Sequence, residues 1–149
     1  MVGTRRHGRE LALQALYQLD VLGTDAAAPA GDLWRHFGEP EEAARSAESR
    51  AFAAELVDGV VAMRPRLDEL IAASAAHWRL ERLSQIDRNI LRLGAYEIVG
   101  RVDVPTSVAI DEAIEIAKRF GSEESPTFVN GVLDHIATLA GAKEGRREL

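Results

Sequence analysis

The chain has 149 residues, a formal net charge of −6 and no cysteine; 46% of its residues are hydrophobic and only 5% are aromatic. A single domain of this length buries roughly two thirds of its unfolded surface, here in an aliphatic core. The lack of cysteine excludes disulfides and thiolate metal sites, and no apolar run reaches the roughly 18 residues that a membrane span requires. The N-terminus lacks the apolar core of a signal peptide, so we expect a soluble, cytoplasmic protein with no membrane partner.

The N-terminus is basic although the chain as a whole is acidic. Arg5, Arg6 and Arg9 are the charged residues of the first nine positions, with no acid among them. Three cations at the start of a helix oppose its dipole, so we expect residues 1–8 to form a flexible basic arm. Two interpretations remain open, namely an arm that binds the phosphates of a polyanion and a terminus that only keeps the chain soluble.

The helix predicted after the arm has two apolar stripes. Leu13, Tyr17 and Val21 recur at i, i+4 and i+8 on the second stripe, and Gln14 flanks them. An open stripe of this kind offers a base a ring to stack on, or offers another protein a surface to cover. The alternative is a central helix that is buried on both sides. The first stripe, which we expect to pack the core, consists of Leu11, Ala12, Ala15, Leu16, Leu19 and Leu22.

The apolar spacing is helical in nearly all of the remaining chain, which predicts an all-α fold of about seven helices in a single compact domain, residues 1–149. Pro65 is expected to interrupt the long helix that begins near Pro40. Ser84 is a predicted N-cap, with Asp87 three residues later. The other predicted segments are a linker at 24–31, a short helix around 33–37, helices from 66 to about 78, from 84 to 100, from about 105 to 120 and from about 125 to 141, and a frayed tail at 142–149.

Sequence motifs for catalysis are absent. Asp111 and Glu115 form an i, i+4 pair, but acids early in a helix are explained by the helix dipole. The four histidines show no ligand spacing, and neither a nucleophile elbow nor a glycine-rich phosphate loop is present. We therefore expect no enzyme, no metal and no cofactor.

A short acidic turn precedes the last predicted helix. Glu123 and Glu124 are favoured there on ordinary electrostatic grounds. Phe128 falls at the edge of the apolar arc of this helix, so we expect its ring to be half covered. Asn130 and Gly131 continue the helical spacing, and the glycine either permits a close helix crossing or leaves a bare patch of backbone.

Three blocks of the sequence resemble the NusB family of transcription antitermination factors. They are residues 5–17, residues 104–113 with 117–121, and residues 128–134, and shorter matches at 86–92 and 95–97 resemble the central helix of the family. Each block is modest by itself, but their order and spacing together are specific. The resemblance implies an all-helical protein of two small packed subbundles without catalytic activity.

The resemblance also implies partners. NusB-like proteins pair with NusE, a protein of the small ribosomal subunit, and bind the boxA element of nascent RNA, notably on ribosomal RNA operons. The complex joins RNA polymerase and other Nus factors and suppresses premature termination. The family pattern matches Arg5, Arg6 and Arg9 to the RNA-binding arm, and Tyr17, Glu124 and Phe128 to the junction of RNA and NusE.

The candidate residues from both lines of inference form two sets. The RNA-binding set is Arg5, Arg6, His7, Arg9, Gln14, Tyr17, Phe128 and Asn130. The partner-binding set is Leu13, Tyr17, Val21, Glu123, Glu124 and Phe128.

The chain departs from the family pattern at two places. His7 stands where an arginine is common, and Pro126-Thr127 stand where a basic residue can occur. These departures predict a lower affinity for RNA when the protein binds alone, and a larger contribution of the protein partner to RNA binding. The acidic body suits a basic partner.

Two other hypotheses are the RNA-binding module of a methyltransferase, for which the chain is too short, and a structural scaffold. A monomer and a homodimer that covers the second stripe are both compatible with the sequence.

Overall fold

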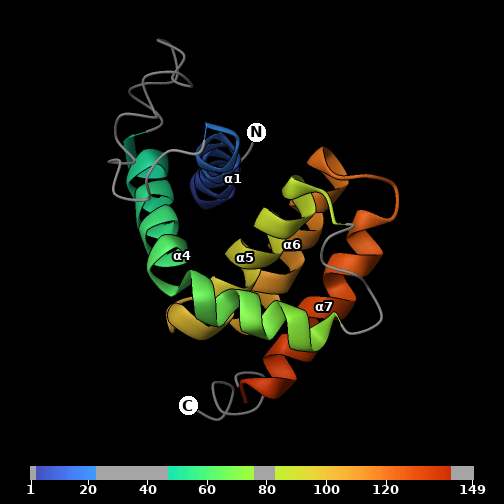
Figure 1. Cartoon of the computed structure of the whole chain (residues 1–149). Coiled ribbons are helices and arrows are strands. Elements are labelled where there is room, and N and C mark those ends of the chain that lie inside the picture. Colours follow the sequence, from blue (N-terminus) through green and yellow to red (C-terminus); the bar gives the residue numbers. More distant parts are fainter. Residues whose placement is uncertain (1–2, 23–46, 76–82, 142–149) are drawn as a thin grey trace. The chain divides into compact units, whose positions relative to one another are not determined.

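The computed structural model describes residues 3–22, 47–75 and 83–141, and every regular element in these ranges is an α-helix (Figure 1). This confirms the all-α prediction. The chain divides into two units, residues 1–62 and residues 63–149, and the boundary lies inside one long helix. The helices are α1 (Thr4–Leu22), α4 (Ala47–Ser74), α5 (Gln85–Gly100), α6 (Thr106–Phe120) and α7 (Ser125–Leu139).

The predicted interruption at Pro65 is wrong, because α4 continues through this residue to Ser74. A proline inside a helix costs about 3 kcal/mol, since it lacks an N–H and crowds the preceding turn. Leu67 and Ile71 just beyond it are at most 1% exposed. Burying two such side chains contributes about 1.5–3 kcal/mol each, which offsets the proline. The linker and short helix predicted within 24–37 and the tail at 142–149 lie outside the described residues.

In the first unit, α4 crosses α1 at the very start of α1. The Ser49 hydroxyl donates a 3.0 Å hydrogen bond to the backbone oxygen of Thr4. A Cβ at Gly8 would lie 2.9 Å from both the Phe52 ring and the Ser49 backbone oxygen, so only glycine allows this approach. The expected flexible arm is therefore corrected: α1 begins at Thr4, and residues 4–8 are helical because α4 holds them.

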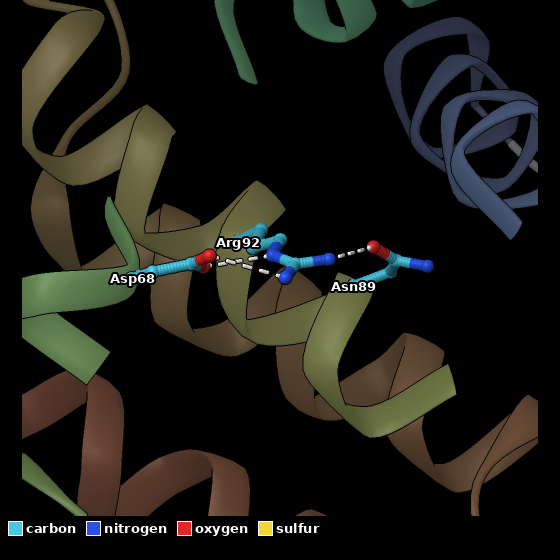
Figure 2. Close-up of polar contacts among 3 residues, drawn as sticks. All are labelled: Asp68, Asn89 and Arg92. Atoms are coloured by element: carbon cyan, nitrogen blue, oxygen red, sulfur yellow. Dashed lines mark hydrogen bonds and ion pairs between the residues drawn. The ribbon is translucent and has the colours of Figure 1, made fainter. Parts of the chain in front are cut away.

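In the second unit, α5, α6 and α7 pack against one another, and α5 is buried on most sides. A Cβ at Gly94 would lie 2.5 Å from Leu133, so α5 and α7 approach closely. Arg92 of α5 forms a two-pronged ion pair with Asp68 of α4, which attaches the end of α4 to this unit (Figure 2). The core of the unit is aliphatic, as its composition requires, and includes Leu67, Ile71, Ile90, Leu91, Ile98, Val104, Val129, Leu133 and Ile136.

Most helix ends of the second unit follow the local sequence signals. The Ser84 hydroxyl accepts a 3.0 Å hydrogen bond from the Asp87 backbone N–H, which confirms the predicted N-cap. The predicted ends at Gly100 and before Gly121 are also found. The last helix begins at Ser125, as the sequence predicted, and Glu124 occupies its N-cap position. Within the described residues, no helix is long and apolar enough to cross a membrane.

Candidate nucleic-acid and protein interface

The three N-terminal arginines lie in the first two turns of α1, and their accessibility differs. Arg5 is exposed and Arg6 is half-buried. Arg9 is only 3% exposed, and its guanidinium carbon lies 5.4 Å from the centroid of the Phe52 ring. The expectation that Arg9 offers an open charge to phosphates is therefore wrong for this structure, because α4 covers that side chain. Arg5 and Arg6 remain accessible.

The start of α1 has a positive potential for two reasons. The first turn contains no acidic residue, and the first hydrogen bond of the helix runs from the His7 N–H to the Gly3 oxygen at 2.9 Å. The backbone N–H groups of residues 4–6 thus precede the intrahelical ladder, and their dipoles add to the charges of Arg5 and Arg6. Such an end attracts anionic groups, phosphates above all.

Polar and aromatic side chains are partly accessible on one side of α1, at its start and again beyond the buried residues 8–13. His7, Gln14 and Gln18 are half-buried, and Tyr17 is 43% exposed. They are spaced at i, i+7, i+10 and i+11, which places them on one side of the helix. We call these four residues the α1 strip. It offers hydrogen-bonding groups and one accessible ring.

The second stripe of α1 is not the open apolar surface that the spacing predicted. Leu13 is only 4% exposed, so it belongs to the core rather than to a free binding face. The side chain of Val21 lies outside the described residues. Of the stripe, Tyr17 alone is shown to be accessible, and its neighbours in the α1 strip are polar.

The candidate residues of the second unit surround the start of α7. Glu123 and Glu124 are exposed in the turn before the helix, and Asn130 is exposed on it. Phe128 is only 7% exposed, which corrects the expectation of a half-covered ring. The ring belongs to the core and does not offer an open stacking surface. Gly131 is exposed, and a Cβ added there would meet nothing within 4 Å, so it leaves a bare patch of backbone rather than a helix crossing.

Several residues that shape these surfaces were missed by the sequence analysis. Ser49 and Phe52 of α4 hold the first turns of α1. Ser125, which is 1% exposed, accepts a 2.9 Å hydrogen bond from the Ser122 N–H and donates one to Asp87. Apart from the local Ser122–Ser125 hydrogen bond, these contacts join positions 38 or more residues apart in the sequence, so no local sequence pattern indicates them.

The acidic pair on α6 has an ordinary structural environment. Asp111 is exposed, and the Glu115 carboxylate lies 3.5 Å from the Lys118 ammonium, one helical turn later. In the described ranges, no group of three or more histidine, aspartate or glutamate side chains is arranged to hold a metal ion. The accessible chemistry on these surfaces is therefore that of cationic, polar and acidic side chains suited to binding.

Comparison with known proteins gives many similar sequences. The Transcription antitermination protein NusB of Geotalea uraniireducens (strain Rf4) is 48% identical over 145 residues, which cover 96% of this chain and 100% of that protein. The protein of the same name from Myxococcus xanthus (strain DK1622) is 47% identical over 136 residues, covering 91% and 96%.

Solved structures give the same result. A NusB from T. maritima superposes with a TM-score of 0.82 at 35% identity and covers 100% of both chains. A crystal structure of the antitermination factors NusB and NusE in complex with dsRNA matches with a TM-score of 0.74 at 25% identity, covering 93% of this chain and 99% of that one. The model of the NusB family matches residues 6–138. The order of the matching blocks, the helical fold and these similarities together show that the chain belongs to the NusB family.

Proposed function

We propose that this protein is a transcription antitermination factor that binds boxA RNA together with NusE. The observation that carries the proposal is that one helix, α1, combines a positive end, where Arg5 and Arg6 are accessible, with the exposed ring of Tyr17 further along. The names of its relatives support the role in antitermination, and a similar NusB has been solved with NusE and RNA.

The surface on α1 suits single-stranded RNA. Arg5 and Arg6 bind phosphates, and the positive helix end adds to their potential. Gln14 offers a side-chain amide that hydrogen-bonds base edges, and Tyr17 offers a ring for a base to stack on, which is worth about 1–3 kcal/mol per base. His7, where family members often carry arginine, offers ring nitrogens that can hydrogen-bond RNA.

The acidic turn before α7 suits a basic protein. Glu123 and Glu124 are both exposed there, and the chain as a whole has a formal net charge of −6. Complementary charge of this kind steers a basic ribosomal protein such as NusE towards the surface and raises its association rate. Asn130 adds a hydrogen-bonding group on the same helix. The proposed complex then joins RNA polymerase and other Nus factors in the cytoplasm, notably on ribosomal RNA operons, and acts by binding, without catalysis.

A salt titration of RNA binding separates this function from that of a structural scaffold. The test variant is Arg5→Ala/Arg6→Ala, and the charge-matched control is Arg64→Ala/Arg66→Ala, which removes two exposed arginines of α4. Fluorescence anisotropy with a short boxA RNA, with and without NusE, gives affinity between about 50 and 200 mM salt. The test variant should bind more weakly and lose about 1.4 from the log–log salt slope, since each phosphate contact on a single strand contributes about 0.7. Equal affinities for test and control variants in both conditions would remove these arginines from the mechanism.

Size-exclusion chromatography with light scattering tests the assembly. The protein should form a stoichiometric complex with NusE and a larger one after boxA RNA is added. A scaffold without this function would elute unchanged in all three runs. The run without partners also decides between a monomer and a homodimer, which the surface of α1 alone does not.

A further inference from the structure

Three contacts from α4 act on the first two turns of α1, where the proposed phosphate-binding arginines lie. The Ser49 hydroxyl bonds the Thr4 backbone oxygen, and the Arg5 and Arg9 guanidinium carbons lie 4.8 Å and 5.4 Å from the Phe52 ring centroid. Arg5 and Arg9 are one helical turn apart, so a single ring serves both. Phe52 is only 6% exposed, which means that the ring is itself fixed by its surroundings.

The approach of the ring requires the glycine between the two arginines. A Cβ at Gly8 would lie 2.9 Å from Cδ2 of Phe52, closer than non-bonded carbons approach. Gly8 is a poor helix former, with a cost of about 1 kcal/mol relative to alanine in other helices. Glycine at position 8 therefore lowers helix propensity but allows a close contact between the Phe52 ring and the backbone that carries Arg5 and Arg9.

Stacking and phosphate binding use different parts of an arginine. The ring attracts the face of the guanidinium, whereas phosphate oxygens are bound by the N–H groups along its edge. A guanidinium held over a ring has already lost much of its rotational freedom, so less freedom is lost when a phosphate binds. Burial of Arg9 against the same ring fixes the second guanidinium as part of the support.

We propose that Phe52 is a positioning residue for RNA binding. Its ring orders the Arg5 guanidinium before RNA binds, so that Arg5 loses less conformational freedom on binding than it would in a flexible arm. The proposal rests on the proposed function and adds a residue of α4 that itself need not touch RNA. It predicts that the ring, and not merely apolar bulk at position 52, contributes to the affinity for RNA.

The test compares Phe52→Leu, which keeps apolar bulk, with Phe52→Tyr, which keeps the ring. Binding to boxA RNA in the presence of NusE is measured by anisotropy on protein shown to be folded by circular dichroism. Phe52→Leu should weaken binding about 2- to 5-fold, the range of a cation–π contact at an exposed site, with no change in salt slope because no charge is lost. Phe52→Tyr should bind like the unchanged protein.

A core substitution one turn along α4 controls for stability. Leu56 is 0% exposed, and Leu56→Val removes packing from the same helix while it leaves the Phe52 ring in place. It should lower the free energy of unfolding and leave RNA affinity unchanged. If Leu56→Val and Phe52→Leu weaken RNA binding equally at equal loss of stability, Phe52 is a structural residue only, and the proposal is overturned.

Arg5→Lys tests the Arg5–Phe52 contact by changing the arginine instead of the ring, so the test does not depend on substituting a buried residue. Lysine keeps the charge but has no planar face to stack, so it should weaken RNA binding in the unchanged protein and have little further effect in Phe52→Leu. Additive effects would contradict the proposal. If Arg5→Ala lowers affinity while all Phe52 variants bind normally, the proposed function stands and this inference fails; if the unchanged protein does not bind boxA RNA even with NusE, both fail.

Discussion

The hydroxyl of Ser125, at the start of α7, donates a 2.7 Å hydrogen bond to the carboxylate of Asp87 in the first turn of α5. The same oxygen accepts from the Ser122 N–H at 2.9 Å, and because a hydroxyl has one proton, the Ser122 hydroxyl is the donor in their 3.1 Å contact. Gly121 leaves the necessary room, since a Cβ there would lie 2.5 Å from the Ser125 oxygen. The turn that carries Glu123 and Glu124 is thereby tied to α5.

Loss of this hydroxyl should therefore destabilise the second unit. Ser125→Ala removes the donor to Asp87 and the acceptor for two groups of Ser122, and we expect the free energy of unfolding to fall by about 1–3 kcal/mol. Urea denaturation measures the change. Ser107→Ala on α6 is the control, because Ser107 is exposed, and its effect should stay within about 0.5 kcal/mol. Equal effects of the two substitutions would show that the Ser125–Asp87 bond contributes nothing to stability.

The ion pair between α4 and α5 should contribute more than its surface neighbour. Arg92 is bound by both oxygens of Asp68, at 2.8 Å and 3.2 Å, and by Asn89 at 3.1 Å (Figure 2). The Arg92 side chain is 6% exposed, so Asp68→Ala leaves a buried charge without its partner. Because the Asp68 side chain is 42% exposed, water replaces part of the interaction, and we expect a loss of about 1.5–3 kcal/mol.

The adjacent residue provides the control for this prediction. Glu69 pairs with Arg66 at 3.8 Å, and the two side chains are 73% and 61% exposed. Glu69→Ala should change the free energy of unfolding by no more than about 0.5 kcal/mol, since exposed pairs are screened by water and salt. Both variants are compared by urea denaturation in the same buffer. A loss for Asp68→Ala no larger than that for Glu69→Ala would contradict the structural role of the pair.

Local signals in the sequence predicted the helices and most of their ends. Ser84, Gly100 and Gly121 mark real boundaries because a cap or a stop depends on groups within one turn of the chain. Pro65 shows the limit of such signals. The cost of a proline is local, but the burial that offsets it comes from side chains whose neighbours are distant in sequence.

Periodicity predicted which residues share a face, but not what covers that face. Leu13 and Tyr17 are one turn apart on the same predicted stripe, yet one is 4% exposed and the other 43%. Arg9 and Phe128 were likewise expected to be accessible and are buried by packing that spacing alone does not reveal. The support from Ser49 and Phe52 joins residues more than 40 positions apart, so a single sequence without its fold gives no sign of it.

Two helical glycines should respond oppositely to alanine. A Cβ at Gly131 meets nothing within 4 Å, so Gly131→Ala should raise the free energy of unfolding by about 0.5–1 kcal/mol through helix propensity. A Cβ at Gly94 would lie 2.5 Å from Cδ1 of Leu133, so Gly94→Ala should lower the free energy of unfolding by about 1–3 kcal/mol through overpacking. Thermal and urea unfolding test both. A destabilised Gly131→Ala would mean that its backbone is not open as the structure has it.

Tyr17 and Leu13 test whether the α1 strip binds RNA. Tyr17→Ala should weaken the binding of boxA RNA with NusE by about 1–3 kcal/mol through lost stacking, while the melting temperature falls little, because the ring is 43% exposed. Leu13→Ala should do the reverse, with a loss of about 2–5 kcal/mol in the free energy of unfolding and unchanged affinity of the folded protein. Tyr17→Phe keeps the ring and should bind normally if stacking is the contact. A large loss of stability in Tyr17→Ala with normal RNA binding would place Tyr17 in the core and remove the ring from the proposed interface.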